Sequence, residues 1–186
     1  MKILIITTNV VSWGGSEVLW SNVANEALAN GHTVMLSTFK HKTIHPNVLA
    51  LIKRGATLHT RPYPSYYDQQ FILWRAVQEF KLRLGASKYA VDWLKVLKFK
   101  PDVVLISSGE TFDYVIDFES FIIKYCLKNN VAYSLLSQYN WEHSLEVSDE
   151  FRYSHKQLAQ NARHFFFVSY RNFKKAELQL ASKISN

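Results

Sequence analysis

The sequence predicts an α/β fold in which helices cover both faces of a parallel sheet. Short, continuous apolar runs, typical of strands that are buried on both faces, recur along the chain. Helical patterns separate these runs, and such alternation predicts right-handed crossovers between parallel strands. The 186 residues, 48% hydrophobic and 20% charged, suit one globular domain. We therefore predict a Rossmann-like, doubly wound sheet of about six strands, formed by residues 1–186 as a single domain.

The first third of the chain is predicted to alternate strand, helix, strand, helix, strand. The strands are expected at residues 2–8, 33–38 and 56–59, and the helices at 16–30 and 46–53. Ser16 is the expected N-cap of the first helix and Gly31 its C-terminal stop. Apolar residues recur along this helix at helical spacing: Val18, Leu19, Val23, Ala24, Ala27 and Leu28.

The middle of the chain is predicted to be a loop followed by a long helical region. Residues 61–69 hold two prolines and no periodicity, which indicates a loop. Residues 70–99 follow a helical pattern with a break at Gly85. The segment 75–100 is rich in lysine and arginine and is interleaved with aromatic residues.

The remaining strands and helices continue the same alternation. Strands are expected at 103–106, 131–136 and 164–168, and helices at 114–127, 149–162 and 170–181. Two polar clusters directly follow two of these strands. Ser107 to Glu110 is interpreted as a second glycine-containing turn, and residues 137–143 as a polar, aromatic loop. No internal repeat or linker is found.

A glycine turn, Gly14-Gly15, joins the first predicted strand to the first helix. At such a turn, free backbone N–H groups and the positive end of the helix dipole point to one spot, which suits a phosphate. In a doubly wound sheet the ligand crevice lies between the carboxyl ends of the first and fourth strands. We therefore expect Gly14-Gly15 and Ser108-Gly109 to line one crevice. A tight turn without a ligand is the structural alternative.

Composition narrows the function classes. The formal charge of +7 indicates an acidic partner, such as nucleic acid, an anionic membrane or a phosphorylated ligand. One cysteine excludes an internal disulfide, and no apolar run is long enough for a signal peptide or a membrane span, so the expected location is the cytoplasm. No nucleic-acid-binding module is recognisable, so nucleic acid is not an expected partner.

Other candidate sites are weak. His41 and His45 are four residues apart, but Pro46 places them in a loop without a third ligand, so they are interpreted as surface histidines. Cys126 is expected to be a buried small side chain on a helix. No G-x-S-x-G motif accompanies the serines, which leaves a hydrolase without its nucleophile.

The motifs around the first turn resemble those of one enzyme family. The fingerprint G-x-G-x-x-G is absent, and Lys40 and Lys42 stand where a dinucleotide-binding sequence would have an acidic residue. The opening instead resembles the N-terminal, acceptor-side half of a retaining GT-B glycosyltransferase that uses nucleotide-sugars. The matching features are Gly14, Gly15 and Glu17, then Gly31-His32, and near the end Phe167-Val168-Ser169, Asn172 and residues 177–180.

This resemblance implies a domain that binds the acceptor and forms one wall of a cleft. The nucleotide-sugar donor would be held by a second, C-terminal Rossmann-like domain, which is absent from these 186 residues. The chain by itself is therefore predicted to transfer no sugar. The family implies no metal or other cofactor, because the leaving diphosphate is stabilised by positioned backbone N–H groups.

Catalytic residues remain unassigned, whereas substrate-binding candidates follow from the turns and the polar loop. Glu17 lies in the first helical turn, where a structural role is equally expected. Glu110 is a weaker candidate than the others. The substrate-binding candidates are Gly14, Gly15, Glu17, Ser108, Gly109, Gln138, Tyr139, Asn140 and His143.

Two further hypotheses stay open. The first belongs to a different function class: the chain is a nucleotide- or NADP-binding Rossmann module without transferase activity, in which Lys40 and Lys42 contact the phosphate. Separately, the basic segment 75–100 either docks on an anionic inner membrane face, where lipid-linked acceptors are found, or is a solvated helix face.

Overall fold

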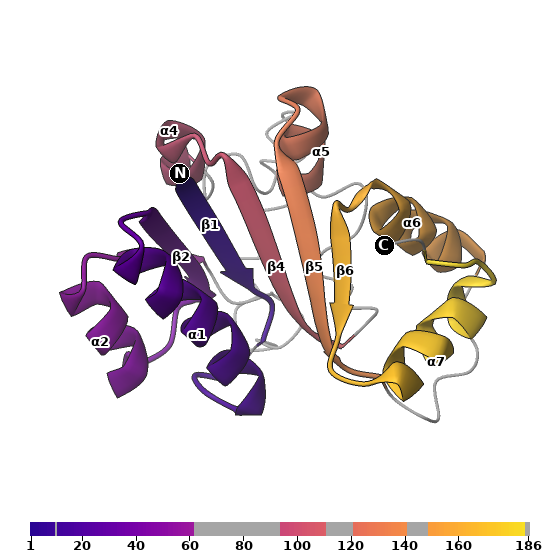
Figure 1. Cartoon of the computed structure of the whole chain (residues 1–186), viewed down its shortest axis with the longest axis horizontal. Coiled ribbons are helices and arrows are strands. Elements are labelled where there is room, and N and C mark those ends of the chain that lie inside the picture. The colour runs from indigo at the N-terminus through magenta and orange to yellow at the C-terminus, as the bar shows by residue number, and fades with distance from the viewer. Residues whose placement is uncertain (10, 62–93, 111–120, 141–148, 185–186) are drawn as a thin grey trace, which may run out of the picture.

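The structure is a six-stranded, all-parallel sheet flanked by helices (Figure 1). The computed structural model describes residues 1–9, 11–61, 94–110, 121–140 and 149–184. The strand order is β3-β2-β1-β4-β5-β6, so the order reverses between β1 and β4. The predicted doubly wound α/β fold is confirmed. The strands are β1 (Lys2–Thr7), β2 (Thr33–Phe39), β3 (Thr57–Arg61), β4 (Val103–Glu110), β5 (Ala132–Tyr139) and β6 (His164–Phe167).

Helices lie on both faces of this sheet (Figure 1). The described helices are α1 (Gly15–Ala29), α2 (Pro46–Lys53), α4 (Leu94–Phe99), α5 (Phe121–Lys128), α6 (Asp149–Asn161) and α7 (Tyr170–Leu180). No helix in the described ranges combines the length and hydropathy needed to span a membrane.

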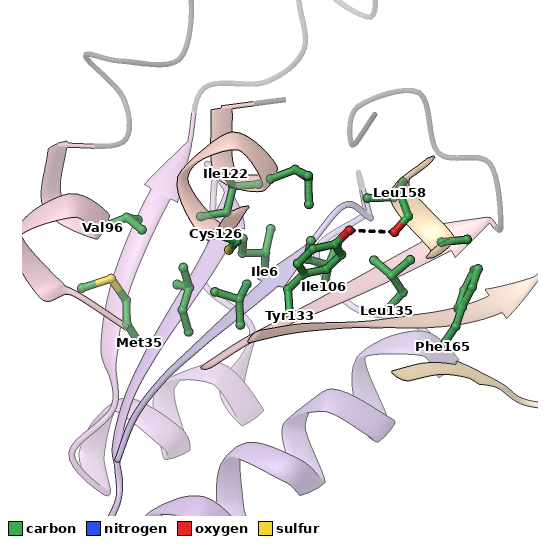
Figure 2. Close-up of a cluster of buried hydrophobic side chains, with 14 of the residues drawn as sticks. Ile6, Met35, Val96, Ile106, Ile122, Cys126, Tyr133, Leu135, Leu158 and Phe165 are labelled. Atoms are coloured by element: carbon green, nitrogen blue, oxygen red, sulfur yellow. Dashed lines mark hydrogen bonds between the residues drawn. The ribbon is translucent and has the colours of Figure 1, made fainter. Parts of the chain in front are cut away.

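Strand β1 separates two hydrophobic cores, because successive side chains of a strand point to opposite faces. Ile3 and Ile5 pack with residues of α1 and α2, whereas Leu4 and Ile6 belong to the core beneath α4, α5 and α6. Figure 2 shows the second core, in which the Tyr133 hydroxyl donates a hydrogen bond of 2.7 Å to the backbone oxygen of Leu158. The apolar opening run therefore anchors both layers.

The single cysteine lies inside the second core (Figure 2). Cys126 is fully buried, as expected, and burial raises the pKa of its thiol to about 12. Since the thiolate is the reactive form, we predict that iodoacetamide at pH 8 does not alkylate the folded protein but alkylates it rapidly in urea. Mass spectrometry of both samples checks this, and equal labelling with and without urea would contradict it.

The two polar clusters predicted as a turn and a loop are largely strand. Ser107 to Glu110 extends β4, and Ser137 to Tyr139 extends β5. Parallel pairing continues through these residues, with Ser108 opposite Ser137 and Glu110 opposite Tyr139. The prediction was wrong here because ladder hydrogen bonds between neighbouring strands outweigh the turn preference of serine and glycine.

Helix α1 begins one residue earlier than predicted. Its N-cap is Gly14, not Ser16, and no side chain caps it. Ser16 is instead the second helical residue, and its hydroxyl bonds to Glu17. At the other end, Gly31 adopts a φ of +74°, the left-handed conformation that favours glycine after a helix. The predicted C-terminal stop is confirmed.

Several predictions lie outside the described residues. These are the loop after Arg61, the helical region 70–93 with Gly85, the start of the helix predicted at 114–127, and residues 141–148 with His143. Of the basic segment 75–100, the structure describes α4 and Lys100.

Candidate functional site

The carboxyl ends of β1 and β4 meet the start of α1 at the point where the strand order reverses. The backbone N–H of Thr8 donates to the Ser107 oxygen at 3.0 Å. The Gly109 N–H in turn lies 3.4 Å from the Thr8 hydroxyl. Two segments were predicted to line one crevice. Gly14-Gly15 comes after β1 and Ser108-Gly109 lies in the adjacent strand β4, as the doubly wound topology requires.

Glu17 is buried in the first turn of α1, with 2% of the residue exposed. Its Oε2 accepts hydrogen bonds from Ser16 Oγ at 2.8 Å and Asn9 Nδ2 at 3.0 Å. Its Oε1 accepts one from Thr7 Oγ1 at 3.3 Å. Together these bonds tie the end of β1 and the loop after it to the start of the helix. The carboxylate therefore holds the shape of the glycine turn.

The two glycines differ in what surrounds them. A Cβ at Gly14 would lie 3.3 Å from Glu17 Oε2, and its φ of −155° is ordinary extended backbone. A Cβ at Gly15 would meet nothing within 4 Å. A side chain at position 14 is thus disfavoured, because the Glu17 carboxylate leaves little room for it. Gly15 leaves open space where a ligand can approach the backbone.

The first backbone N–H groups of α1 are available to a ligand. Within the described part of the chain, the N–H of Glu17 bonds back to the Gly14 oxygen, but those of Gly15 and Ser16 donate no hydrogen bond. They stand at the positive end of a 15-residue helix. This is the arrangement that binds phosphates at helix starts.

Gln138 reaches this turn from β5, as the crevice hypothesis expects. Its Nε2 donates to the Ser16 backbone oxygen at 2.6 Å and lies 3.0 Å from Ser107 Oγ. Its own backbone oxygen accepts from Asn172 Nδ2 on α7 at 3.5 Å. One side chain therefore connects β4, β5 and the first turn of α1.

The other candidates are more dispersed. Asn140 is buried, and its amide donates to Gln179 Oε1 on α7 at 2.9 Å, which is a contact within the fold. Tyr139 is 50% exposed at the end of β5. Ser108 and Gly109 lie within β4 and are partly buried. Glu110 ends that strand.

A pocket of about 260 Å³ lies beside the glycine turn, on the β2 side of α1. Its wall includes Glu17 and Trp20 of α1, and the loop from β2 to α2 brings basic and imidazole groups to it: Lys40, His41, Lys42 and His45. Sequence reasoning assigned both histidines to the surface and missed this pocket. Their position just after β2, at the carboxyl edge that also carries the glycine turn, was the available signal.

The two histidines of this loop have different surroundings. Burial lowers the pKa of His41, and the Glu17 carboxylate acts in the opposite direction. His45 is the N-cap of α2, where its Nδ1 accepts from the Asn47 N–H at 3.3 Å, and its ring stacks on Trp13 at 4.4 Å. Across the described ranges, no three His, Cys, Asp or Glu side chains gather as a metal site would require.

Trp20 forms a buried part of the pocket wall, with 1% of the residue exposed. Its Nε1 has no hydrogen-bond partner among the described residues. A buried donor left without an acceptor costs about 1–3 kcal/mol. The indole N–H of Trp20 therefore forms no stabilising hydrogen bond with the described residues.

Comparison with known proteins gave one type of match. No family model matches the chain, and no curated protein does. Among solved structures, the chain is similar to the lipopolysaccharide outer core galactosyltransferase WaaB in its apo form, with a TM-score of 0.49 and 16% identity. The match covers 96% of this chain and 42% of that one. The chain thus spans less than half the length of that structure.

Proposed function

We propose that this chain is the acceptor-side domain of a glycosyltransferase, which moves a sugar from a nucleotide-sugar to a glycan, lipid-linked or other acceptor. The observation that carries the proposal is the first turn of α1. There the N–H groups of Gly15 and Ser16, at the positive end of a helix, donate no hydrogen bond within the described part of the chain, and a Cβ at Gly15 would meet nothing within 4 Å. This turn also carries the Gly14, Gly15 and Glu17 pattern that resembles the family's opening.

In this role the turn acts on the donor's diphosphate. Negative charge grows on that group as the sugar leaves, and oriented N–H groups stabilise it without reorganising. Glu17 keeps the turn in place through its bonds to Asn9 and Ser16. Gln138 fastens the same turn from β5 through the Ser16 oxygen. On this proposal, some of the substrate-binding candidates would bind the substrates and the others would position them, and no metal or other cofactor would be needed.

A second Rossmann-like domain or subunit is the partner that this function needs, because it would hold most of the nucleotide-sugar. Docking of the basic segment 75–100 on an anionic membrane would bring a lipid-linked acceptor to the cleft. Location in the cytoplasm, where nucleotide-sugars are available, belongs to the same proposal.

The second candidate function is binding of NADP or another nucleotide without transfer. It is favoured by Lys40 and Lys42, which line the pocket at the end of β2, where a 2′-phosphate could be bound.

Ligand binding and turnover separate the two functions. We predict that calorimetric titration of the 186-residue chain finds no NADP binding tighter than about 100 μM, and that the chain alone releases no labelled sugar from UDP-, GDP- or ADP-sugars. Transfer is expected once a donor-binding domain is supplied from the same gene or a neighbouring one. Micromolar NADP affinity would instead overturn the glycosyltransferase proposal, and turnover by the chain alone would show that no partner domain is needed.

A further inference from the structure

We propose that the pocket between α1 and the loop from β2 to α2 binds a small hydroxylated ligand that carries a phosphate group. This inference rests on the proposed function and deepens it, because it names the chemical class of the acceptor: a sugar or polyol phosphate. The pocket is separate from the Gly15 and Ser16 N–H groups, which do not line it.

The loop from β2 to α2 brings the positive charge of the pocket. Lys40 and Lys42 both line it, and within the described ranges neither forms an ion pair. The N-terminus of α2 begins at the pocket, where His45 and Val48 belong to the wall, so the positive end of that helix adds to the field. A phosphate placed beside this loop would meet two ammonium groups and a helix dipole.

The part of the wall that α1 contributes suits a hydroxyl group. Glu17 is the one carboxylate of the described lining, and it would repel a phosphate placed beside it. A carboxylate offers about four acceptor positions, and three donors from the fold reach Glu17. The remaining position can accept a hydrogen bond from a ligand hydroxyl. The charge distribution therefore orients the ligand, with its phosphate toward Lys40 and Lys42 and a hydroxyl toward Glu17.

The size and the walls of the pocket agree with this ligand class. Its volume of about 260 Å³ falls below the about 300–1,000 Å³ of typical drug-sized sites, which favours a monosaccharide-sized ligand. Trp20, Val48 and Leu58 supply apolar surface against which the C–H face of a sugar can pack. Trp20, whose Nε1 is buried and has no partner among the described residues, belongs to this wall.

Titrations of the 186-residue chain with glucose 6-phosphate, glucose and inorganic phosphate test the proposal, followed by ¹H–¹⁵N NMR. Glucose 6-phosphate is expected to bind at least 10-fold more tightly than glucose, with shifts at residues 38–45 and the Trp20 indole, and to weaken as salt rises. The double variant Lys40→Gln/Lys42→Gln should lose at least 10-fold in affinity. The charge-matched control Lys53→Gln/Lys128→Gln, which alters exposed lysines outside the pocket, should lose less than 2-fold.

Vesicles distinguish the source of the phosphate. Binding to phosphatidylinositol 4-phosphate vesicles, but not to phosphatidylcholine vesicles, that depends on Lys40 and Lys42 would assign the site to a lipid-linked polyol phosphate. Response to glucose 6-phosphate alone would assign it to a soluble acceptor. Equal affinity for glucose and glucose 6-phosphate, or an unchanged affinity in the double variant, would overturn the proposal.

Failure of this inference and failure of the proposed function have different signatures. If Lys40→Gln/Lys42→Gln left sugar transfer unaffected, the glycosyltransferase proposal would still hold, but the acceptor would not be bound by these lysines. The opposite result is also possible to recognise. If glucose 6-phosphate bound in the pocket but no nucleotide-sugar supported transfer with the donor-binding domain present, the pocket would be a phosphate site and the glycosyltransferase proposal would be wrong.

Discussion

Replacing Gly15 with alanine is expected to lower sugar transfer about 100-fold while the protein stays folded. A methyl group at this position meets no atom of the described chain within 4 Å, so it costs the fold nothing by contact. It would occupy the space from which a diphosphate approaches the Gly15 and Ser16 N–H groups. Because alanine restricts the unfolded chain more than glycine does, by about 0.4–1 kcal/mol, the thermal midpoint should rise slightly. Steady-state transfer with the donor-binding domain present, and thermal unfolding by circular dichroism, measure the two effects.

Two companion variants make the Gly15 experiment specific. Asn22→Ala changes an exposed residue of the same helix and should alter neither activity nor stability appreciably. Gly14→Ala would press on the Glu17 carboxylate, so both transfer and the free energy of unfolding should fall. If Gly15→Ala kept full activity, the first turn of α1 would not be in contact with the donor phosphates, and the central support for the proposed function would be lost.

Replacing Trp20 with alanine is expected to lower the free energy of unfolding by about 3–5 kcal/mol. The side chain is 1% exposed and packs in the core formed with Ala24, Leu36 and Leu51. It also meets Trp13 edge to face, at 6.0 Å between ring centroids, and Trp13 in turn stacks on His45. Truncating the Trp20 indole therefore leaves a cavity in the core and removes the side chain on which Trp13 and the pocket wall pack. Because domains are stable by only about 5–15 kcal/mol, much of the protein's stability is at stake.

Trp20→Phe separates packing from polarity in this experiment. Phenylalanine keeps most of the apolar volume and removes the N–H that has no partner among the described residues. We therefore expect a cost well below that of Trp20→Ala, in the range of about 1–2 kcal/mol. Urea unfolding followed by circular dichroism measures both. A cost below about 1 kcal/mol for Trp20→Ala would mean that the indole is not in the core.

The apolar pattern of α1 did not determine which face of this helix is buried. Six apolar residues occur at helical spacing, but the structure leaves Val18, Leu19 and Val23 between 41% and 45% exposed and buries Trp20, Ala24 and Ala27. Apolar residues surround much of this helix, so periodicity alone could not determine which side faces the sheet. Contact with β1, β2 and α2 decided it.

The sequence by itself determined the order of strands and helices, the doubly wound topology and the place where the sheet order reverses. Local signals were sufficient for these: uninterrupted apolar runs for buried strands, and glycine after α1 for its end. It also placed Gly14, Gly15, Glu17 and Gln138 at one edge of the sheet, since carboxyl ends of neighbouring parallel strands meet there.

Only the tertiary structure decided what those residues do with one another. Ser107 stays in β4 because β1 and β5 both pair with it, and beyond it β5 continues the pairing at Ser108 and Glu110. Glu17 can be buried because Thr7, Asn9 and Ser16 all donate hydrogen bonds to its carboxylate, and two of these residues lie outside the helix. The pocket beside it combines α1 with the loop after β2. Hydrogen bonds and cavities between distant segments depend on three-dimensional packing, which no local pattern records.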